Sequence, residues 1–335
     1  MKVVITGGTG FIGRKLAARL LARGAIAGPG GKDTAIDELV LFDVAAPNPP
    51  LPTADKRLKV VTGDIADPAT VRTLIDKRTG TVFHLAAVVS GQAEADTDIG
   101  LRVNLDGTRA VLEACRALGT CPRLVFASSL AVYGGKLPPA VSDDTALTPQ
   151  TSYGNQKAIG ELLVNDYSRK GYIDGRSPRL PTIVIRPGKP NRAASTWASS
   201  IFREPLSGVD VVCPVTRDVV MPVLSPRRLV AALEKLHDIR GEALGYSRAI
   251  QLPGIAVTVA EMVAALRRAG GEAAVQRIRW EPDPVIQKIV AGWPLAISAK
   301  RAESLGLEAD RDMDEIVQAF IEDDLPAQRA MAGTA

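Results

Sequence analysis

A tyrosine and a lysine four residues apart carry the clearest chemical signal in this sequence. Tyr153 and Lys157 stand at positions i and i+4 of a predicted helix, so both side chains lie on one face and can reach the same molecule. A phenol with a pKa of about 10 is a poor base at neutral pH, but a neighbouring ammonium favours the phenolate. The pair is therefore suited to proton transfer. Any surface helix can carry the same spacing by chance, so the pair alone does not establish a function.

A serine at the end of an apolar run adds a third group. Ser129 ends the segment 124–129, which is typical of a buried strand. A hydroxyl at that point can donate to a substrate oxygen while the tyrosine removes the proton, which stabilises developing alkoxide charge. Ser129, Tyr153 and Lys157 are the predicted catalytic residues, and Ser129 and Tyr153 are also predicted to contact the substrate.

A glycine-rich segment follows the first predicted strand and opens a helix. In Thr6-Gly-Gly-Thr-Gly-Phe-Ile-Gly13 the glycines fall where a dinucleotide pyrophosphate meets backbone amides. A side chain at Gly7 or Gly10 would block the turn or hold the phosphate away, and one at Gly13 would push the helix off the sheet. Such motifs also occur in structural turns, but the position between strand and helix favours cofactor binding. The predicted contacts to the cofactor are Gly7, Gly10, Phe11, Ile12 and Gly13.

Two carboxylates follow the second and third predicted strands. Asp43 can accept both ribose hydroxyls of an adenosine and repel a 2′-phosphate, which predicts NAD rather than NADP. Its distance from Gly13 exceeds the usual spacing of about 20 residues, so Asp43 could also simply end a strand. Asp64 is suited to the adenine amino group, with Ile65 packed on the ring. A plain turn explains Asp64 and Ile65 equally well.

Short apolar runs alternate with helical patterns in the first half of the chain. The runs are residues 2–6, 38–43, 58–62, 80–85, 123–128 and 182–186. This rhythm predicts an α/β fold with a Rossmann-type, doubly wound parallel sheet. Asp67-Pro68 and Ser225-Pro226 are predicted helix starts, and the glycine-rich residues 24–37 are predicted to form a surface loop.

The rhythm breaks after Arg186, which predicts a smaller C-terminal α/β lobe for the substrate. Thr258 and Glu261 have capping-box spacing and open a predicted helix that ends at Gly270-Gly271. The predicted domains are an NAD-binding domain of residues 1–186 plus about 225–253, a substrate lobe of about 187–224 and 254–325, and a frayed tail of 326–335.

Bulk composition limits the function classes. Apolar residues make up 46% and charged residues 23% of the 335 residues, as in ordinary folded proteins. Lys and Arg exceed Asp and Glu only by 41 to 37, which argues against a nucleic-acid partner. No apolar stretch approaches the length of a membrane span, and the chain runs directly into a predicted strand without room for a signal peptide. Three cysteines without metal-like spacing predict no metal site and fit a reducing cytoplasm.

In this order the motifs resemble the extended short-chain dehydrogenase/reductase superfamily, which includes NAD-dependent epimerases and dehydratases. The resemblance spans essentially the whole chain and rests on the glycine loop, Asp64-Ile65, His84-Leu-Ala-Ala87, Asn104, Ser129, Tyr153 and Lys157. It implies that Leu85, Ala86 and Ala87 line the adenosine and ribose, that Asn104 supports the active site and contacts the cofactor, and that Pro187 and Gly188 face the nicotinamide amide. His84 and His237 are predicted to have no catalytic or metal role.

Relatives in this superfamily often dimerise through two helices of each subunit. The segments 97–118 and 150–170 are the corresponding candidates here, so a homodimer is predicted. Apolar faces on these helices could equally pack inside one monomer.

Departures from each subgroup narrow the reaction. Sugar-nucleotide dehydratases carry an acidic pair just after the serine, whereas this chain has Leu130-Ala131, which disfavours dehydration. Longer strings at 84–96, 144–153 and 186–191 resemble a subgroup that oxidises a four-carbon sugar acid at C2 with NAD. That resemblance implies a 2-oxo acid product and a small anionic substrate. Such a substrate needs one cationic anchor and a few hydroxyl partners. The candidates are Ser90, Lys189, Asn191, Arg192 and Ser200, each of which is also explained as loop surface.

Two alternatives stay open. An NAD-retaining nucleotide-sugar 4-epimerase must grip a diphosphate, and Lys189, Arg192, Arg203 and Arg217 form no recognisable pattern for that grip. A non-catalytic NAD-binding scaffold is disfavoured because it has no use for a complete serine, tyrosine and lysine set.

Overall fold

Buried strands form the centre of the first part of the chain, because their runs of valine, isoleucine, leucine and phenylalanine have no polar side to turn to water. The computed structural model describes residues 1–48, 54–190 and 193–333. Two compact units are present. Unit 1 comprises Met1–Val132, Thr151–Arg179 and Val230–Ile250, and unit 2 comprises Tyr133–Gln150, Leu180–Leu229 and Gln251–Ala335. Residues 133–150 thus belong to unit 2, whereas the predicted NAD-binding domain included them.

The elements that lie wholly or mostly in unit 1 are β1 (Lys2–Thr6), α1 (Phe11–Arg23), β2 (Ala25–Ala27), β3 (Asp33–Ala35), β4 (Glu38–Asp43), β5 (Leu58–Thr62), α2 (Pro68–Leu74), β6 (Thr79–His84), α3 (Ser90–Ala95), α4 (Thr97–Gly100), the π-helical η1 (Leu101–Asp106), α5 (Gly107–Leu118), β7 (Arg123–Phe126), β8 (Ser128–Ser129), the 3-10 turn η2 (Leu130–Val132), α6 (Ser152–Arg169), β9 (Asp174–Leu180), α8 (Pro226–Asp238), η3 (Gly241–Leu244) and β13 (Ala249–Gln251).

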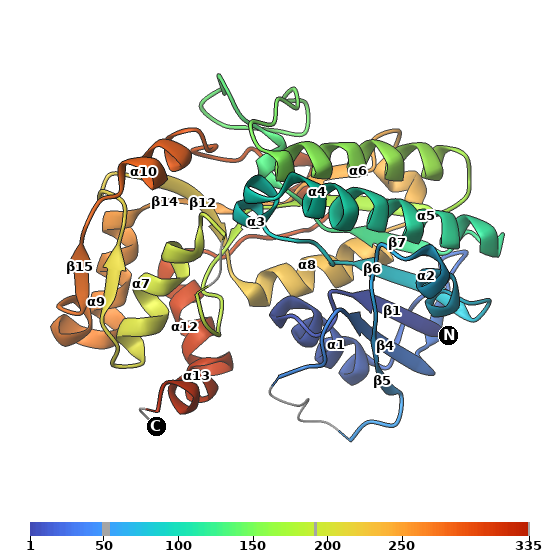
Figure 1. Ribbon diagram of the computed structural model, residues 1–335, viewed down its shortest axis with the longest axis horizontal. Helices are drawn as coiled ribbons and strands as arrows, with labels where there is room; N and C mark the ends of the chain where they lie inside the picture. Colours follow the sequence, from blue (N-terminus) through green and yellow to red (C-terminus); the bar gives the residue numbers. More distant parts are fainter. Residues whose placement is uncertain (49–53, 191–192, 334–335) are drawn as a thin grey trace. The chain divides into compact units, whose positions relative to one another are not determined.

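The main sheet has the strand order β13-β9-β7-β6-β1-β4-β5, with β8 paired to β9. The pairings of β1, β4, β5, β6, β7 and β9 with one another are parallel, which confirms the Rossmann-type fold. Helices α5 and α6 run side by side over the sheet (Figure 1). The chain leaves β1 toward β4 and later returns to β6 on its other side. The carboxyl ends of β1 and β6 therefore flank the switch point where such sheets bind ligands.

One predicted strand of the sheet is wrong. The sheet strand is β9, and Thr182–Ile183 instead form the short β10, which pairs with β12 in a separate small sheet of unit 2. The apolar pattern missed β9 because Arg176, Ser177 and Arg179 are among its buried residues. Their guanidinium and hydroxyl groups make this strand look like a loop in a hydrophobicity pattern.

The glycine-rich residues 24–37 are a hairpin of β2 and β3 rather than the predicted loop. Ile26 and Ile36, at either side of it, are buried. The backbone amide of Ala27 donates to Asp238 at the end of α8. The apolar residues thus give this insertion a packed underside, which explains its regular structure.

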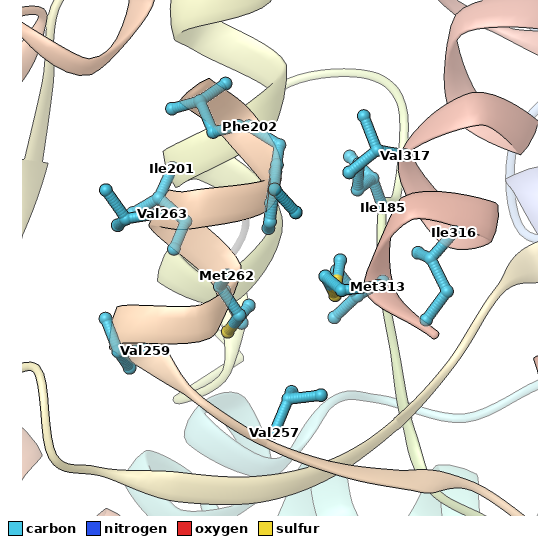
Figure 2. Packing of buried hydrophobic residues seen from close by; sticks show 14 of the residues in the cluster. Ile185, Ile201, Phe202, Val257, Val259, Met262, Val263, Met313, Ile316 and Val317 are labelled. Carbon is cyan, nitrogen blue, oxygen red and sulfur yellow. The ribbon is translucent and has the colours of Figure 1, made fainter. Parts of the chain in front are cut away.

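Unit 2 contains β10 (Thr182–Ile183), α7 (Thr196–Leu206), β11 (Val211–Cys213), β12 (Val220–Leu224), β14 (Ile255–Thr258), α9 (Val259–Val275), β15 (Ile278–Trp280), α10 (Pro284–Ala291), α11 (Lys300–Ser304), α12 (Met313–Asp323) and α13 (Leu325–Ala332). Figure 2 shows its core, where Phe202 of α7, Met262 of α9 and Ile316 of α12 belong to one buried cluster. No helix of the described residues is long and apolar enough to cross a membrane.

Most of the helix starts and ends predicted from the sequence are present in the structure. The Thr258–Glu261 capping box and the Asp67 cap with Pro68 are confirmed. The predicted stop at Gly270-Gly271 is confirmed, because Gly271 has a non-helical backbone, with φ 71° and ψ −177°, and a second short helical segment follows it to Val275. The predicted frayed tail is wrong over most of its length, because α13 occupies Leu325–Ala332 and buries Gln328.

Candidate functional site

The glycine loop is shaped by close backbone approach. Gly7 has a φ of +67°, and a Cβ there would lie 2.8 Å from the amide nitrogen of Ala86. A Cβ at Gly13 would lie 2.7 Å from the carbonyl oxygen of Gly7. Gly8, which the motif analysis did not single out, is equally constrained, since its Cβ would lie 2.6 Å from the carbonyl oxygen of Ile5. These three glycines are required by the protein's own packing.

Gly10 differs from the other three. A Cβ there would meet only the carbonyl oxygen of Gly7, at 3.2 Å. Gly10 is also the N-cap of α1. No side chain caps this helix end, and the first turn contains no acidic residue. Backbone amides at an uncapped helix N-terminus can donate hydrogen bonds to the pyrophosphate of a dinucleotide, and Gly10 carries no side chain that would block its approach. The loop therefore fits NAD.

Asp43 lies against the glycine loop. Its carboxylate accepts hydrogen bonds from the amides of Thr9, at 3.1 Å, and Val44, at 2.8 Å. These contacts fix the carboxylate beside the loop, where the predicted ribose contact requires it. The contact itself stays a prediction.

Asp64 and Ile65 have partners within unit 1. Asp64 accepts from the amide of Ala66 at 2.9 Å and pairs with Arg102. The bond from Ala66, with the guanidinium of Arg102, holds the pKa of the Asp64 carboxyl below its usual value. Ile65 is buried in the apolar cluster beneath α2 and α5. Their predicted contacts with an adenine ring remain untested.

Asn104 ties the segment after β6 to α6. Its side-chain oxygen accepts from the amide of Val88 at 2.9 Å, and its amide group donates to the carbonyl of Val88 at 3.2 Å and to the oxygen of Gln156 at 2.7 Å. Asn104 and Gln156 are each 2% exposed. Asn104 thus fixes the path of the chain after Leu85, Ala86 and Ala87, which supports its predicted role at the active site.

His84 is the centre of a buried hydrogen-bond chain. Its Nδ1 lies 2.7 Å from the hydroxyl of Thr6, and its Nε2 lies 3.0 Å from that of Thr108. Because Thr108 donates to the carbonyl of Asn104, we assign the imidazole proton to Nε2. Burial and the nearby Lys157 lower the pKa of His84 to about 3. A neutral, fully engaged imidazole links β1, β6 and α5.

The N-terminus of helix α6 positions Tyr153. Thr151 caps it by accepting from the amide of Gly154, which places Tyr153 in the first turn. The positive end of the helix dipole there favours a phenolate. A Cβ at Gly160 would collide with the ring of Phe126, so this glycine allows α6 to approach β7 closely.

Lys157 is buried under the tyrosine. Its Nζ lies 5.6 Å from the centroid of the Tyr153 ring and 4.7 Å from that of Phe126. It donates to the carbonyl oxygen of Ala127 at 2.8 Å, which uses one of its three donors. Burial lowers the pKa of Lys157 to about 8, although the charge of Glu161 opposes this shift. The structure thus joins the predicted phenol and ammonium on one face of α6.

Ser129 lies on β8, which packs against α6. Its hydroxyl oxygen accepts from the amide of Ala131 at 3.1 Å. Because this bond uses a lone pair, the hydroxyl keeps its own proton to donate. Ser129 and Tyr153 are both partly exposed, as groups that meet a substrate must be.

The other predicted substrate residues divide between the units. Ser90 begins α3 in unit 1 and is partly exposed. In unit 2, Lys189 is exposed, and the buried Ser200 accepts from Arg203 at 2.9 Å. Asn191 and Arg192 lie outside the described residues.

Pro187 and Gly188 lie in unit 2. Gly188 has a φ of +93°, and its amide donates to the side chain of Gln328 at 2.7 Å. The predicted approach of both residues to the nicotinamide stays a prediction. Within the described ranges no cluster of three or more His, Cys, Asp or Glu residues could hold a metal ion.

Sequence reasoning missed two buried residues of α6, the helix that carries the predicted tyrosine and lysine. Gln156 contacts Asn104, and Glu161 forms a buried ion pair with Arg179. Glu161 follows Lys157 by four residues, so helical spacing was a signal that could have revealed it.

Comparison with known proteins identifies a family model, similar sequences and a similar solved structure. Residues 3–216 match the model of the NAD dependent epimerase/dehydratase family. A D-erythronate dehydrogenase from Cupriavidus necator is 56% identical over 96% of this chain and 98% of its own length. A second protein of that name, from Haemophilus influenzae, is 45% identical over 97% of this chain and 100% of its own. The crystal structure of a nucleoside-diphosphate-sugar epimerase from Agrobacterium tumefaciens has a TM-score of 0.90 and 44% identity, covering 97% of this chain and 95% of its own.

Proposed function

Because this chain belongs to the NAD dependent epimerase/dehydratase family, we propose that it oxidises D-erythronate at C2 to the 2-oxo acid with NAD as cofactor. The observation that carries the substrate is the pair of D-erythronate dehydrogenases, which match nearly the full length of this chain. The observation that carries the chemistry is the buried Lys157 ammonium beneath the Tyr153 ring.

The mechanism we propose uses three side chains of unit 1. Tyr153, as phenolate, accepts the proton of the C2 hydroxyl. Ser129 donates a hydrogen bond to that oxygen, which orients it and stabilises its developing charge. Lys157 favours the phenolate by its charge and holds the nicotinamide ribose with its remaining donors. When bound, NAD would supply the hydride acceptor, so that the alcohol would lose one hydride and one proton and become a ketone.

The cofactor-binding residues in this proposal are those of the glycine loop, Asp43, Asp64, Ile65, Leu85, Ala86, Ala87, Pro187 and Gly188. Lys189 and Arg192 are the proposed cationic anchors for the substrate carboxylate, with Ser90, Asn191 and Ser200 as hydroxyl or amide partners. A homodimer through α5 and α6 is part of the proposal, and the exposed Leu162 and Ile159 of α6 are compatible with it. Cytoplasmic location is proposed as well, with Cys115, Cys121 and Cys213 all free thiols.

The test is release of NADH. Purified protein with excess NAD and D-erythronate should increase absorbance at the NADH band in proportion to the acid consumed. D-threonate and L-erythronate serve as stereochemical controls, and UDP-glucose serves as a nucleotide-sugar control. Similarity to the Agrobacterium tumefaciens nucleoside-diphosphate-sugar epimerase makes a nucleotide-sugar epimerase the second candidate. That enzyme would interconvert the sugar nucleotide without net NADH, and this result with no turnover of erythronate would replace our proposal.

A further inference from the structure

A buried ion pair lies one helical turn beyond the proposed catalytic lysine. Glu161 of α6 and Arg179 of β9 are 3% and 5% exposed. The guanidinium donates from Nε to the two carboxylate oxygens at 2.9 and 3.1 Å, and its terminal nitrogen donates to Oε2 at 2.7 Å. This double contact pairs the buried carboxylate with a guanidinium, which offsets the water that both groups lose on burial.

Glu161 also holds the strand that leads to Ser129. The hydroxyl of Ser128 donates to Oε1 of Glu161 at 2.5 Å. One helical turn earlier, Lys157 donates to the carbonyl of Ala127 at 2.8 Å. The two side chains, four residues apart on α6, thus hold two consecutive residues immediately before Ser129. These contacts fix the register between the helix that carries Tyr153 and the strand that carries Ser129.

Charge is the second link between Glu161 and the site. Among the described residues, the titratable groups that face the Lys157 ammonium are Tyr153 and Glu161 from α6 and His84 from β6, with Arg179 behind Glu161. His84 is neutral, because its pKa is about 3. Glu161 is therefore the anion whose charge favours the buried ammonium, in surroundings with little water to screen it.

We propose that Glu161, held by Arg179, is a positioning residue of the active site, which keeps Lys157 cationic and sets the position of Ser129 relative to Tyr153. This inference rests on the proposed function for its catalytic consequence. It does not need the substrate for its electrostatic part, which concerns side chains of the protein without cofactor. An ion pair that only stabilised the fold would change neither the protonation of Lys157 nor the pH dependence of the reaction.

The first experiment measures the lysine directly. The protein without cofactor is labelled with ¹³Cε-lysine, and the resonance of Lys157 is assigned with Lys157→Arg and titrated from pH 6 to 11. In Glu161→Gln the amide keeps the shape of the side chain and an oxygen for Ser128 but loses the charge. We expect the pKa of Lys157 to fall by about one pH unit. An unchanged pKa in the folded variant would overturn the proposal.

The second experiment measures the reaction. In the wild type, kcat for D-erythronate should decline at high pH as Lys157 loses its proton. Glu161→Gln should move this decline to lower pH by the same amount as the NMR titration. Glu161→Asp keeps the charge but draws it back from Ser128, so it should restore the position of the decline while kcat stays reduced about tenfold. If Glu161→Asp and Glu161→Gln have identical pH profiles, charge is not the cause.

A control variant tests whether the effect is specific to Glu161, and a double variant is available if Glu161→Gln does not fold. Glu113 of α5 pairs with Arg116 and bonds to Tyr167, and Glu113→Gln should leave both Lys157 readouts unchanged. If Glu161→Gln does not fold, the double variant Glu161→Met and Arg179→Met replaces the pair with apolar groups of similar size. The pKa of Lys157 should still fall below the wild-type value, and equality with the wild type would refute the proposal. Failure of the wild type to oxidise erythronate would refute the proposed function and leave the NMR result standing.

Discussion

The buried charge of Lys157 is predicted to reduce the free energy of unfolding of the protein. Its pKa is about 8 in the folded protein, against an ordinary value of 10.5. At pH 7 the lysine is protonated in both the folded and the unfolded chain, so the full difference of about 2.5 pH units applies. At about 1.4 kcal/mol per pH unit, the buried charge costs about 3 kcal/mol of folding free energy. Because only 3% of this residue is exposed, little solvent screening reduces that figure.

The sign of the pH dependence follows from proton binding. Between pH 8 and 10.5 the unfolded chain binds more protons at this lysine than the folded protein does, so the contribution of Lys157 to stability rises with pH through that window. Other groups work in the opposite direction. Burial raises the pKa of Cys115 to about 12, and burial together with Glu113 raises that of Tyr167 to about 12, which reduces stability at high pH.

The measurement is therefore a difference between two proteins. Urea unfolding of wild type and Lys157→Met, both without cofactor, is followed from pH 7 to 10.5. The gap between their unfolding free energies should change by about 3 kcal/mol across this range, in favour of the wild type as pH rises. Loss of the donor to the Ala127 carbonyl adds an offset that does not depend on pH. Lys170→Met, at the exposed end of α6, is the control and should show a constant gap. Parallel curves for wild type and Lys157→Met would refute the reasoning.

Four further predictions concern the site. Tyr153→Phe should lower kcat about 100-fold or more while NADH binding, followed by fluorescence, is retained; near-native turnover would exclude the phenol as the base. Asp43→Ala should weaken NAD binding about tenfold and relax the rejection of NADP, both measured by calorimetric titration, and equal wild-type affinity for the two cofactors would contradict the role of Asp43. Gly8→Ala should destabilise the fold by about 1–3 kcal/mol in urea unfolding, because its Cβ would meet fixed backbone. Gly10→Ala should instead remain nearly as stable as the wild type and lose NAD affinity, with Gly292→Ala as the neutral control.

Much of unit 1 followed from local pattern. Strands β1 and β4 are where the apolar runs predicted them, because parallel strands buried on both faces leave a continuous apolar signature. The edge strand β5 also coincides with its predicted run, although most of its residues are exposed. Strand β9 left none, since Arg176 and Arg179 obtain their partners from residues distant in sequence. A hydrophobicity pattern along the sequence contains no information about those partners.

The parts of the site that could be predicted are those whose residues lie close together in the sequence. Tyr153 and Lys157 are four residues apart on one helix, and the structure joins them. The constraint on Gly8 was not visible, because it comes from the backbone of Ile5 and from Leu41 of the neighbouring strand. Gln156 was overlooked for a similar reason, since its meaning depends on Asn104 across the packing of α6 against η1.

The division of the chain has a consequence for biosynthesis. Strand β7 pairs with β9, yet residues 133–150 of the other unit separate the two strands in sequence. Leu124, Val125 and Phe126 of β7 are buried in the folded protein. During synthesis β7 lacks its neighbour until the residues of β9 have left the ribosome. An uncovered apolar edge is a template for intermolecular pairing. Chains truncated between residues 127 and 173 should therefore aggregate more than the full-length protein.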